Sequence, residues 1–197
     1  MTQHKTKEER RTQILDAAAQ CFAEKGYHAA SMEDLVQASS LSKGALYWYF
    51  KGKREIFRSL LERWLNEYTH ALETVVESDV PPREKILSVF RLIELSGAAN
   101  PEMLRSQIEF FSVAMRDEDF LEWFRESYTQ NHSLFEKILD EGVRAEQFQP
   151  MNVTAVARQM AAMIDGGFVQ NELLHDDVRD RANWETMAES FLDLLEH

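Results

Sequence analysis

The sequence is dominated by apolar residues that recur every three or four positions, a spacing that places them along one side of an α-helix. Only seven Gly and four Pro occur in 197 residues, and most of them stand between such segments. Runs in which apolar and polar residues alternate, as in half-buried strands, are not evident. We therefore expect an all-α protein, and its length is sufficient for a sizeable core.

Capping signals divide the first 50 residues into three helices. Apolar residues over about 8–25 share one helical face, and the single cysteine, Cys21, lies on it as a small core residue. Ser31, followed by Asp34, resembles a capping box and predicts a second helix. Ser42 can cap a third helix over 43–49. Two short helices joined by a tight turn predict a helix-turn-helix, whose second helix enters the major groove of DNA.

The predicted third helix has two unlike faces. One face carries apolar residues that can pack against neighbouring helices: Leu46, Tyr49 and Phe50. The other carries a cation and two aromatic hydrogen-bond donors: Lys43, Tyr47 and Trp48. Such a surface is unusual toward water and useful toward nucleic acid, so we interpret this segment as a recognition helix.

A long helix over 53–78 should follow, which at about 1.5 Å per residue would span roughly 39 Å and connect two cores. The sequence Asp79-Val80-Pro81-Pro82 ends it. Further helices are expected over 83–96, from about 101, from 118 to about 147 with a possible interruption at Gly142, from about 153 to 174, and from about 183 to the end. The predicted domains are 1–52 and 53–197.

Charge supports this division. Residues 1–60 contain ten Lys and Arg against seven Asp and Glu, whereas residues 61–197 contain twelve against twenty-seven. The first part, with a net charge of +3, tolerates phosphate, and the second, with −15, repels it.

The single cysteine and the absence of an apolar signal-peptide core predict a cytoplasmic protein without a disulfide. We expect no membrane span, metal or cofactor, because no apolar run is long enough and the six His residues lack ligand spacing. No catalytic motif indicates an enzyme.

These residues resemble the TetR/AcrR family of transcriptional regulators. The similarity covers about the first third of the chain: Ile14 to Phe22, Gly26-Tyr27, Ser31 to Val36 and Leu41 to Lys53. The resemblance implies that Lys43, Ala45, Tyr47 and Trp48 face the DNA. It also implies that Ser31, Ser42 and Lys53 hold phosphates. For the two serines, a role as helix caps alone stays open.

Two positions depart from the family pattern. Ser40 stands in the turn where the family often has Gly, and a left-handed backbone there would disfavour Ser by roughly 1 kcal/mol. Trp48 stands where His is common. The turn should still form, but operator preference cannot be transferred from relatives.

The resemblance also implies that the acidic part forms a homodimer and binds a small-molecule effector. The broad apolar faces of the last two helices are the candidates for the dimer interface, with closure of the monomer core as the alternative: Val156, Met160, Ile164, Met187, Phe191 and Leu195. The tandem Gly166-Gly167 indicates a close backbone approach. Pocket candidates are aromatic, Met or polar, with the core as the alternative: Trp64, Gln107, Phe110, Phe111, Met115, Phe124, Tyr128, Met163 and Phe168.

Three acids, Glu94, Glu109 and Asp165, lie near apolar stretches, and one that faces the pocket would favour a cationic or hydrogen-bonding ligand. The sequence therefore predicts a homodimeric repressor that binds a palindromic DNA operator and is released by an apolar or amphipathic effector. The alternative is a ligand-independent DNA-binding adaptor that recruits a protein partner through its acidic body.

Overall fold

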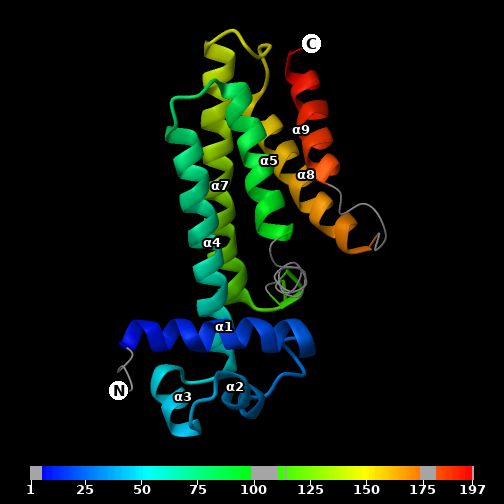
Figure 1. Ribbon diagram of the computed structural model, residues 1–197. Helices are drawn as coiled ribbons and strands as arrows, with labels where there is room; N and C mark the ends of the chain where they lie inside the picture. Colours follow the sequence, from blue (N-terminus) through cyan, green and yellow to red (C-terminus); the bar gives the residue numbers. More distant parts are fainter. Residues whose placement is uncertain (1–5, 99–110, 114, 174–180, 197) are drawn as a thin grey trace.

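The structure is a computed structural model that describes residues 6–98, 111–113, 115–173 and 181–196 (Figure 1). Within these ranges the chain is helical and contains no strand, which confirms the predicted all-α class. The helices are α1 (Lys7–Lys25), α2 (Met32–Ser39), α3 (Lys43–Tyr49), α4 (Lys53–Glu77), α5 (Pro82–Ala98), α7 (Glu118–Arg144), α8 (Val153–Leu173) and α9 (Arg181–Glu196). The predicted sixth helix lies outside the described residues, apart from a helical turn at 111–113.

Most helix ends lie within two residues of their predicted positions because local signals set them. A capping box between Thr6 and Glu9 opens α1, and Gly26, at φ 78°, ends it. The exception is α7, which ends three residues early and continues without interruption through Gly142. A Cβ at that glycine would lie 2.0 Å from Cδ2 of Phe148, so Gly142 lets the chain fold back against the helix.

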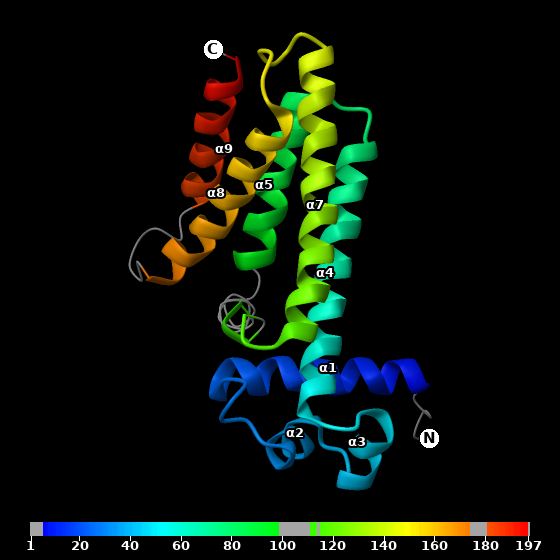
Figure 2. The same cartoon turned by 180° about the vertical axis from the view of Figure 1, so that it is seen from behind.

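The helices are arranged as a small head and a long body (Figures 1 and 2). The head comprises α1, α2 and α3 at one end of the molecule. Helix α4 leaves the head, and α7 runs beside it along the body, with α5, α8 and α9 packed on one side. Head and body are therefore joined by one continuous helix.

Two separate hydrophobic cores match this arrangement. The head core contains residues of α1, α2 and α3, the first half of α4 as far as Leu61, and Val113 and Phe120. The body core begins at Leu72 of α4 and includes α5, α7, α8 and α9. Helix α4 thus connects two cores, as predicted, and Cys21 is a buried residue of the first.

Polar contacts join the helices of the body. The buried Lys85 of α5 donates from Nζ to the carbonyl oxygen of Val76 and to Oε2 of Glu141, both at 2.8 Å. Thr69 Oγ1 of α4 donates to Asn131 Oδ1 of α7 at 3.0 Å, and both residues are buried. Buried polar groups that are satisfied in this way fix how helices align. None of the helices described has the length and apolar character needed to cross a membrane.

Candidate DNA-binding and effector-binding sites

Helix α3, the predicted recognition helix, has one buried and one exposed face, as its spacing indicated. Leu46 and Phe50 are buried, at 0% and 1% exposure, and anchor the helix in the head core. Tyr47 and Trp48 are exposed, at 43% and 67%. Ser42 Oγ accepts a hydrogen bond from the backbone N–H of Ala45 at 3.2 Å and so caps the helix. An aromatic surface held away from the core in this way is available to a partner.

The turn before α3 forms despite its serine. Ser40 has a left-handed backbone, with φ 55°, and ends α2 there. The position therefore requires the conformation that favours Gly, and Ser carries a strain of about 1 kcal/mol. At the other end of α2, Ser31 Oγ accepts from the N–H of Asp34 and donates to its Oδ2. Ser31 is thus a cap in this structure, and its phosphate contact stays a prediction.

Contacts with lysines lower the pKa values of two carboxylates in the helix-turn-helix. A hydrogen bond from Lys25 and others from Ser31 hold the pKa of Asp34 far below its usual range. Lys43 Nζ lies 2.7 Å from Glu33 Oε1 at the surface, and this contact lowers the pKa of Glu33. Because both partners of that pair are exposed, water and salt weaken it. Lys43 is therefore held only weakly at the surface, and its predicted DNA contact stays a prediction.

The predicted phosphate contact of Lys53 conflicts with the structure. Its Nζ donates to the carbonyl oxygens of Tyr27 (2.6 Å), His28 (3.1 Å) and Ala30 (2.7 Å). An ammonium has three hydrogen-bond donors, so none is left for phosphate. Lys53 instead ties the loop before α2 to the start of α4.

The sequence predicted no individual role for the basic residues of α1. Lys7 Nζ lies 5.4 Å from the ring centroid of Trp48, beside the exposed face of α3. The guanidinium of Arg11 stacks on Phe50 at 4.6 Å and donates to Ser59 Oγ at 2.7 Å. The basic composition of residues 1–11 was a signal of such contacts. In the structure, α1 places Lys7 beside the exposed face of α3.

Three of the predicted pocket residues come together in the body. The rings of Phe111 and Phe124 lie 5.3 Å apart, as do those of Phe124 and Tyr128. His132, one turn further along α7, continues this aromatic row, with its ring 4.8 Å from that of Tyr128. From within this row the Tyr128 hydroxyl donates to Oδ2 of Asp165 on α8. Asp165 is thus the candidate acid that contacts this row, whereas Glu94 lies elsewhere on α5 and Glu109 lies outside the described residues.

The carboxyl group of Asp165, which Tyr128 contacts, is largely removed from water. Burial raises the pKa of Asp165 to about 6. Burial also raises the pKa of Tyr68 on α4, and the charge of Asp165 adds to that shift. Burial, with the nearby charge of Arg158, lowers the pKa of His132, so its imidazole is neutral at pH 7. We call Tyr68, Tyr128, His132 and Asp165 the polar cluster.

No ring contact joins the other predicted pocket residues to this row in the described structure. Trp64 packs against the head core, as Phe124 also does, and Met163 packs against the body core. Met115 is 69% exposed, so it cannot line an enclosed pocket. Gln107, Phe110 and the side chain of Phe168 lie outside the described residues.

A groove of about 320 Å³ between α5 and α9 contains none of the predicted aromatic, Met or Gln pocket residues, but one of the three candidate acids, Glu94, lines it. It is lined by Leu87, Phe90, Arg91, Glu94, Leu95, Trp184, Glu185 and Ala188.

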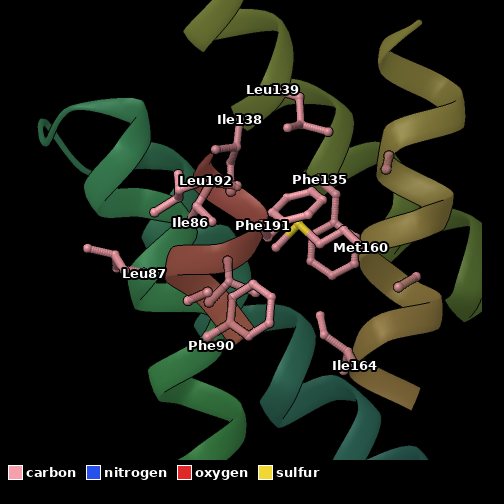
Figure 3. Packing of buried hydrophobic residues seen from close by; sticks show 14 of the residues in the cluster. Ile86, Leu87, Phe90, Phe135, Ile138, Leu139, Met160, Ile164, Phe191 and Leu192 are labelled. Carbon is pink, nitrogen blue, oxygen red and sulfur yellow. The ribbon is translucent and has the colours of Figure 1, made fainter. Parts of the chain in front are cut away.

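The prediction that the apolar faces of α8 and α9 form the dimer interface is wrong for four residues. Met160, Ile164, Phe191 and Leu195 are at most 5% exposed in the single chain. Figure 3 shows Met160, Ile164 and Phe191 among Phe90, Phe135 and other core residues. The half-buried Val156 and Met187 pack against the same core. These faces close the protomer because α5 and α7 cover them.

The close approach predicted at Gly166-Gly167 is found at Gly167, where a Cβ would lie 2.7 Å from Cη2 of Trp184 on α9. Among the residues that the structure describes, no three His, Cys, Asp or Glu side chains are grouped to hold a metal.

Comparisons with known proteins agree with this fold. Residues 14–60 match the family described as "Bacterial regulatory proteins, tetR family", and residues 82–196 match "BetI-type transcriptional repressor, C-terminal". YfiR of Bacillus subtilis, an uncharacterized helix-turn-helix regulator, is 27% identical over 93% of this chain and 89% of its own.

Two solved structures show the same fold. A TetR regulator from Haloarcula marismortui has a TM-score of 0.84, with 19% identity over 96% of this chain and 100% of that chain. FadR of Bacillus subtilis, solved with stearoyl-CoA, has a TM-score of 0.77, with 21% identity over 94% and 97%. Because the C-terminal match alone spans more than half of the sequence, the chain belongs to the TetR family of transcriptional regulators, which are DNA-binding proteins and not enzymes.

Proposed function

We propose that this regulator is a homodimeric repressor that binds a palindromic operator and is released by a small apolar or amphipathic effector. The observation that carries the proposal is the free face of α3, where Tyr47 and Trp48 are exposed and Lys43 has only a surface carboxylate as partner. These side chains can donate to phosphates and cover sugars, and the methyl of Ala45 suits a thymine methyl.

A dimer is supported by the geometry of DNA. Two recognition helices about 34 Å apart meet successive major grooves and multiply weak half-site contacts. Since the inner faces of α8 and α9 are buried within the protomer, we assign the interface to their outer faces. Among the side chains that the structure describes, Leu194 of α9 is 78% exposed and Val169 of α8 is 43% exposed.

Effector release requires a link between the body and the head. The start of α7 supplies it, because Phe120 lies in the head core with its ring 6.2 Å from that of Phe57. Arg54 of α4 donates to both carboxylate oxygens of Asp117, at 3.0 and 2.8 Å, and Asp117 caps α7. A ligand that shifts α7 beside α4 would therefore move or release the head. A coupling of about 1–3 kcal/mol changes occupancy five-fold or more.

The comparisons support a ligand-binding body. FadR has this fold and was solved with stearoyl-CoA, an amphipathic ligand. The adaptor alternative is not favoured, because the body matches the C-terminal domain of a transcriptional repressor.

Gel-shift titration with the regulator's own promoter region tests the proposal. Binding should weaken as salt increases and should be lost in the double variant Lys43→Ala/Tyr47→Ala. Lys137→Ala, which removes an exposed cation from α7, is the matched control. Tight binding by the double variant would refute the recognition surface.

A further inference from the structure

The polar cluster contains a carboxylate with too few partners. A carboxylate accepts up to about four hydrogen bonds. In the described structure Asp165 receives one, from the Tyr128 hydroxyl, and no Lys or Arg forms an ion pair with it there. A desolvated charge without a counter-charge is costly, and a cation that enters beside it removes that cost.

A second atom of the cluster also lacks a partner. Nε2 of His132 is buried and makes no hydrogen bond within the structure described. The charged groups that act on this imidazole are Arg158 on α8 and Glu136 on α7, and the arginine charge is the stronger influence. Polar atoms buried at helix interfaces are usually paired. Tyr128 contacts both the ring of His132 and the carboxylate of Asp165, so these two under-partnered groups together indicate a site for a polar ligand group.

The approach to the carboxylate is aromatic. Phe124, Tyr128 and His132 succeed one another at four-residue intervals on α7, and Phe111 extends the row. Aromatic faces pack against apolar and aromatic ligand bodies and attract cations. The row and the carboxylate together fit a molecule with an apolar body and a positive end.

Charge argues against an anionic head group at the same place. Asp165 would repel a carboxylate or a phosphate, and residues 61–197 carry a net charge of −15. We propose that the polar cluster is the polar end of the effector site and takes a protonated amine attached to an aromatic or apolar body, with the ammonium donating to Asp165. This inference rests on the proposed function, because it assumes that the body binds an effector.

Calorimetric titration of the full chain at pH 8 tests the head-group class. The probes are 4-phenylbutylamine, 4-phenylbutan-1-ol and 4-phenylbutanoate, which share one body, together with stearoyl-CoA. The amine should bind most tightly. Asp165→Asn should weaken the amine about tenfold or more and leave the alcohol within about twofold. Asp165→Glu, which keeps the charge, should retain the preference for amine over alcohol, and Asp79→Asn, in the exposed α4–α5 turn, should change nothing.

Three outcomes would overturn the inference: tighter binding of the butanoate or stearoyl-CoA than of the amine, no binding of the amine, or equal amine affinity in wild type and Asp165→Asn. Circular dichroism establishes that each variant is folded. The same preparations are titrated with promoter DNA. Intact DNA binding without an amine preference refutes only this inference, whereas loss of DNA binding by the wild type refutes the proposed function.

Discussion

Replacing Asp165 by Asn should stabilise the protein at pH 8. Burial raises the pKa of this carboxyl from its ordinary 3.8 to about 6, so the folded chain holds the charged form at a cost. A difference of about two pH units corresponds to ~3 kcal/mol. The Tyr128 hydroxyl donates to Asp165 and favours the charged form, so this value is an upper limit. We expect a gain of about 1–3 kcal/mol in the free energy of unfolding.

The stability gained by Asp165→Asn should disappear in acid, because the folded and unfolded chains bind the proton of Asp165 with different affinities. The folded protein binds the proton of Asp165 more tightly than the unfolded chain does. The stability that protonation contributes is fully present below about pH 3.8 and is lost as pH rises through about 6. Asn resembles the protonated carboxyl at every pH. The variant should therefore exceed the wild type most at pH 8 and approach it near pH 4.

Urea unfolding followed by circular dichroism measures this difference at pH 8, 6 and 4.5, with protein concentration held fixed because association shifts apparent stability. Asp34 and Asp117, whose pKa values are lowered by Lys25 and Arg54, titrate equally in both proteins and cancel. Asp79→Asn is the control for removal of one charge. A variant less stable than the wild type at pH 8, or a difference independent of pH, would refute the reasoning.

Three further outcomes are expected. Ser40→Gly should raise the free energy of unfolding by up to about 0.6 kcal/mol, because relief of about 1 kcal/mol of left-handed strain is partly offset by the added entropy of the unfolded chain, about 0.4–1 kcal/mol; a lower urea midpoint would contradict this. Lys53→Met should cost about 1–3 kcal/mol through three lost hydrogen bonds, whereas the exposed Lys51→Met should be nearly neutral in thermal unfolding. Arg54→Ala should preserve operator affinity but weaken effector-induced release in gel shifts, and unchanged release would exclude the Asp117 link.

The features that were predictable from sequence are those set by neighbours in the chain. Ser42 caps α3 three residues away, and Gly26 ends α1 where a positive φ is needed. The two faces of α3 follow from helical spacing alone, which is why Leu46 is buried and Trp48 exposed as expected. Such signals fix the helix bounds and the exposed face of α3 without reference to the rest of the fold.

Features that depend on contacts distant in sequence were not predictable in the same way. Periodicity shows that Met160 and Phe191 lie on apolar faces, but it does not say whether the same chain or a partner covers them, and α5 and α7 turn out to do so. A lysine at the start of a helix suits phosphate. For Lys53 the deciding acceptors are the carbonyls of Tyr27 and Ala30, more than 20 residues earlier.

Asp165 shows where local patterning is informative because it fails. Its carboxylate is largely removed from water and makes no ion pair in the described structure, whereas charged groups ordinarily stay in water or are paired. Trp48 is the opposite case, a large ring exposed to water. A chain selected for stability alone would place an aromatic residue in the body and a charge at the surface of the head. Local rules are broken mainly where function requires it. The desolvated Asp165 and the exposed Trp48 therefore support the effector and DNA hypotheses more directly than residues that follow the pattern.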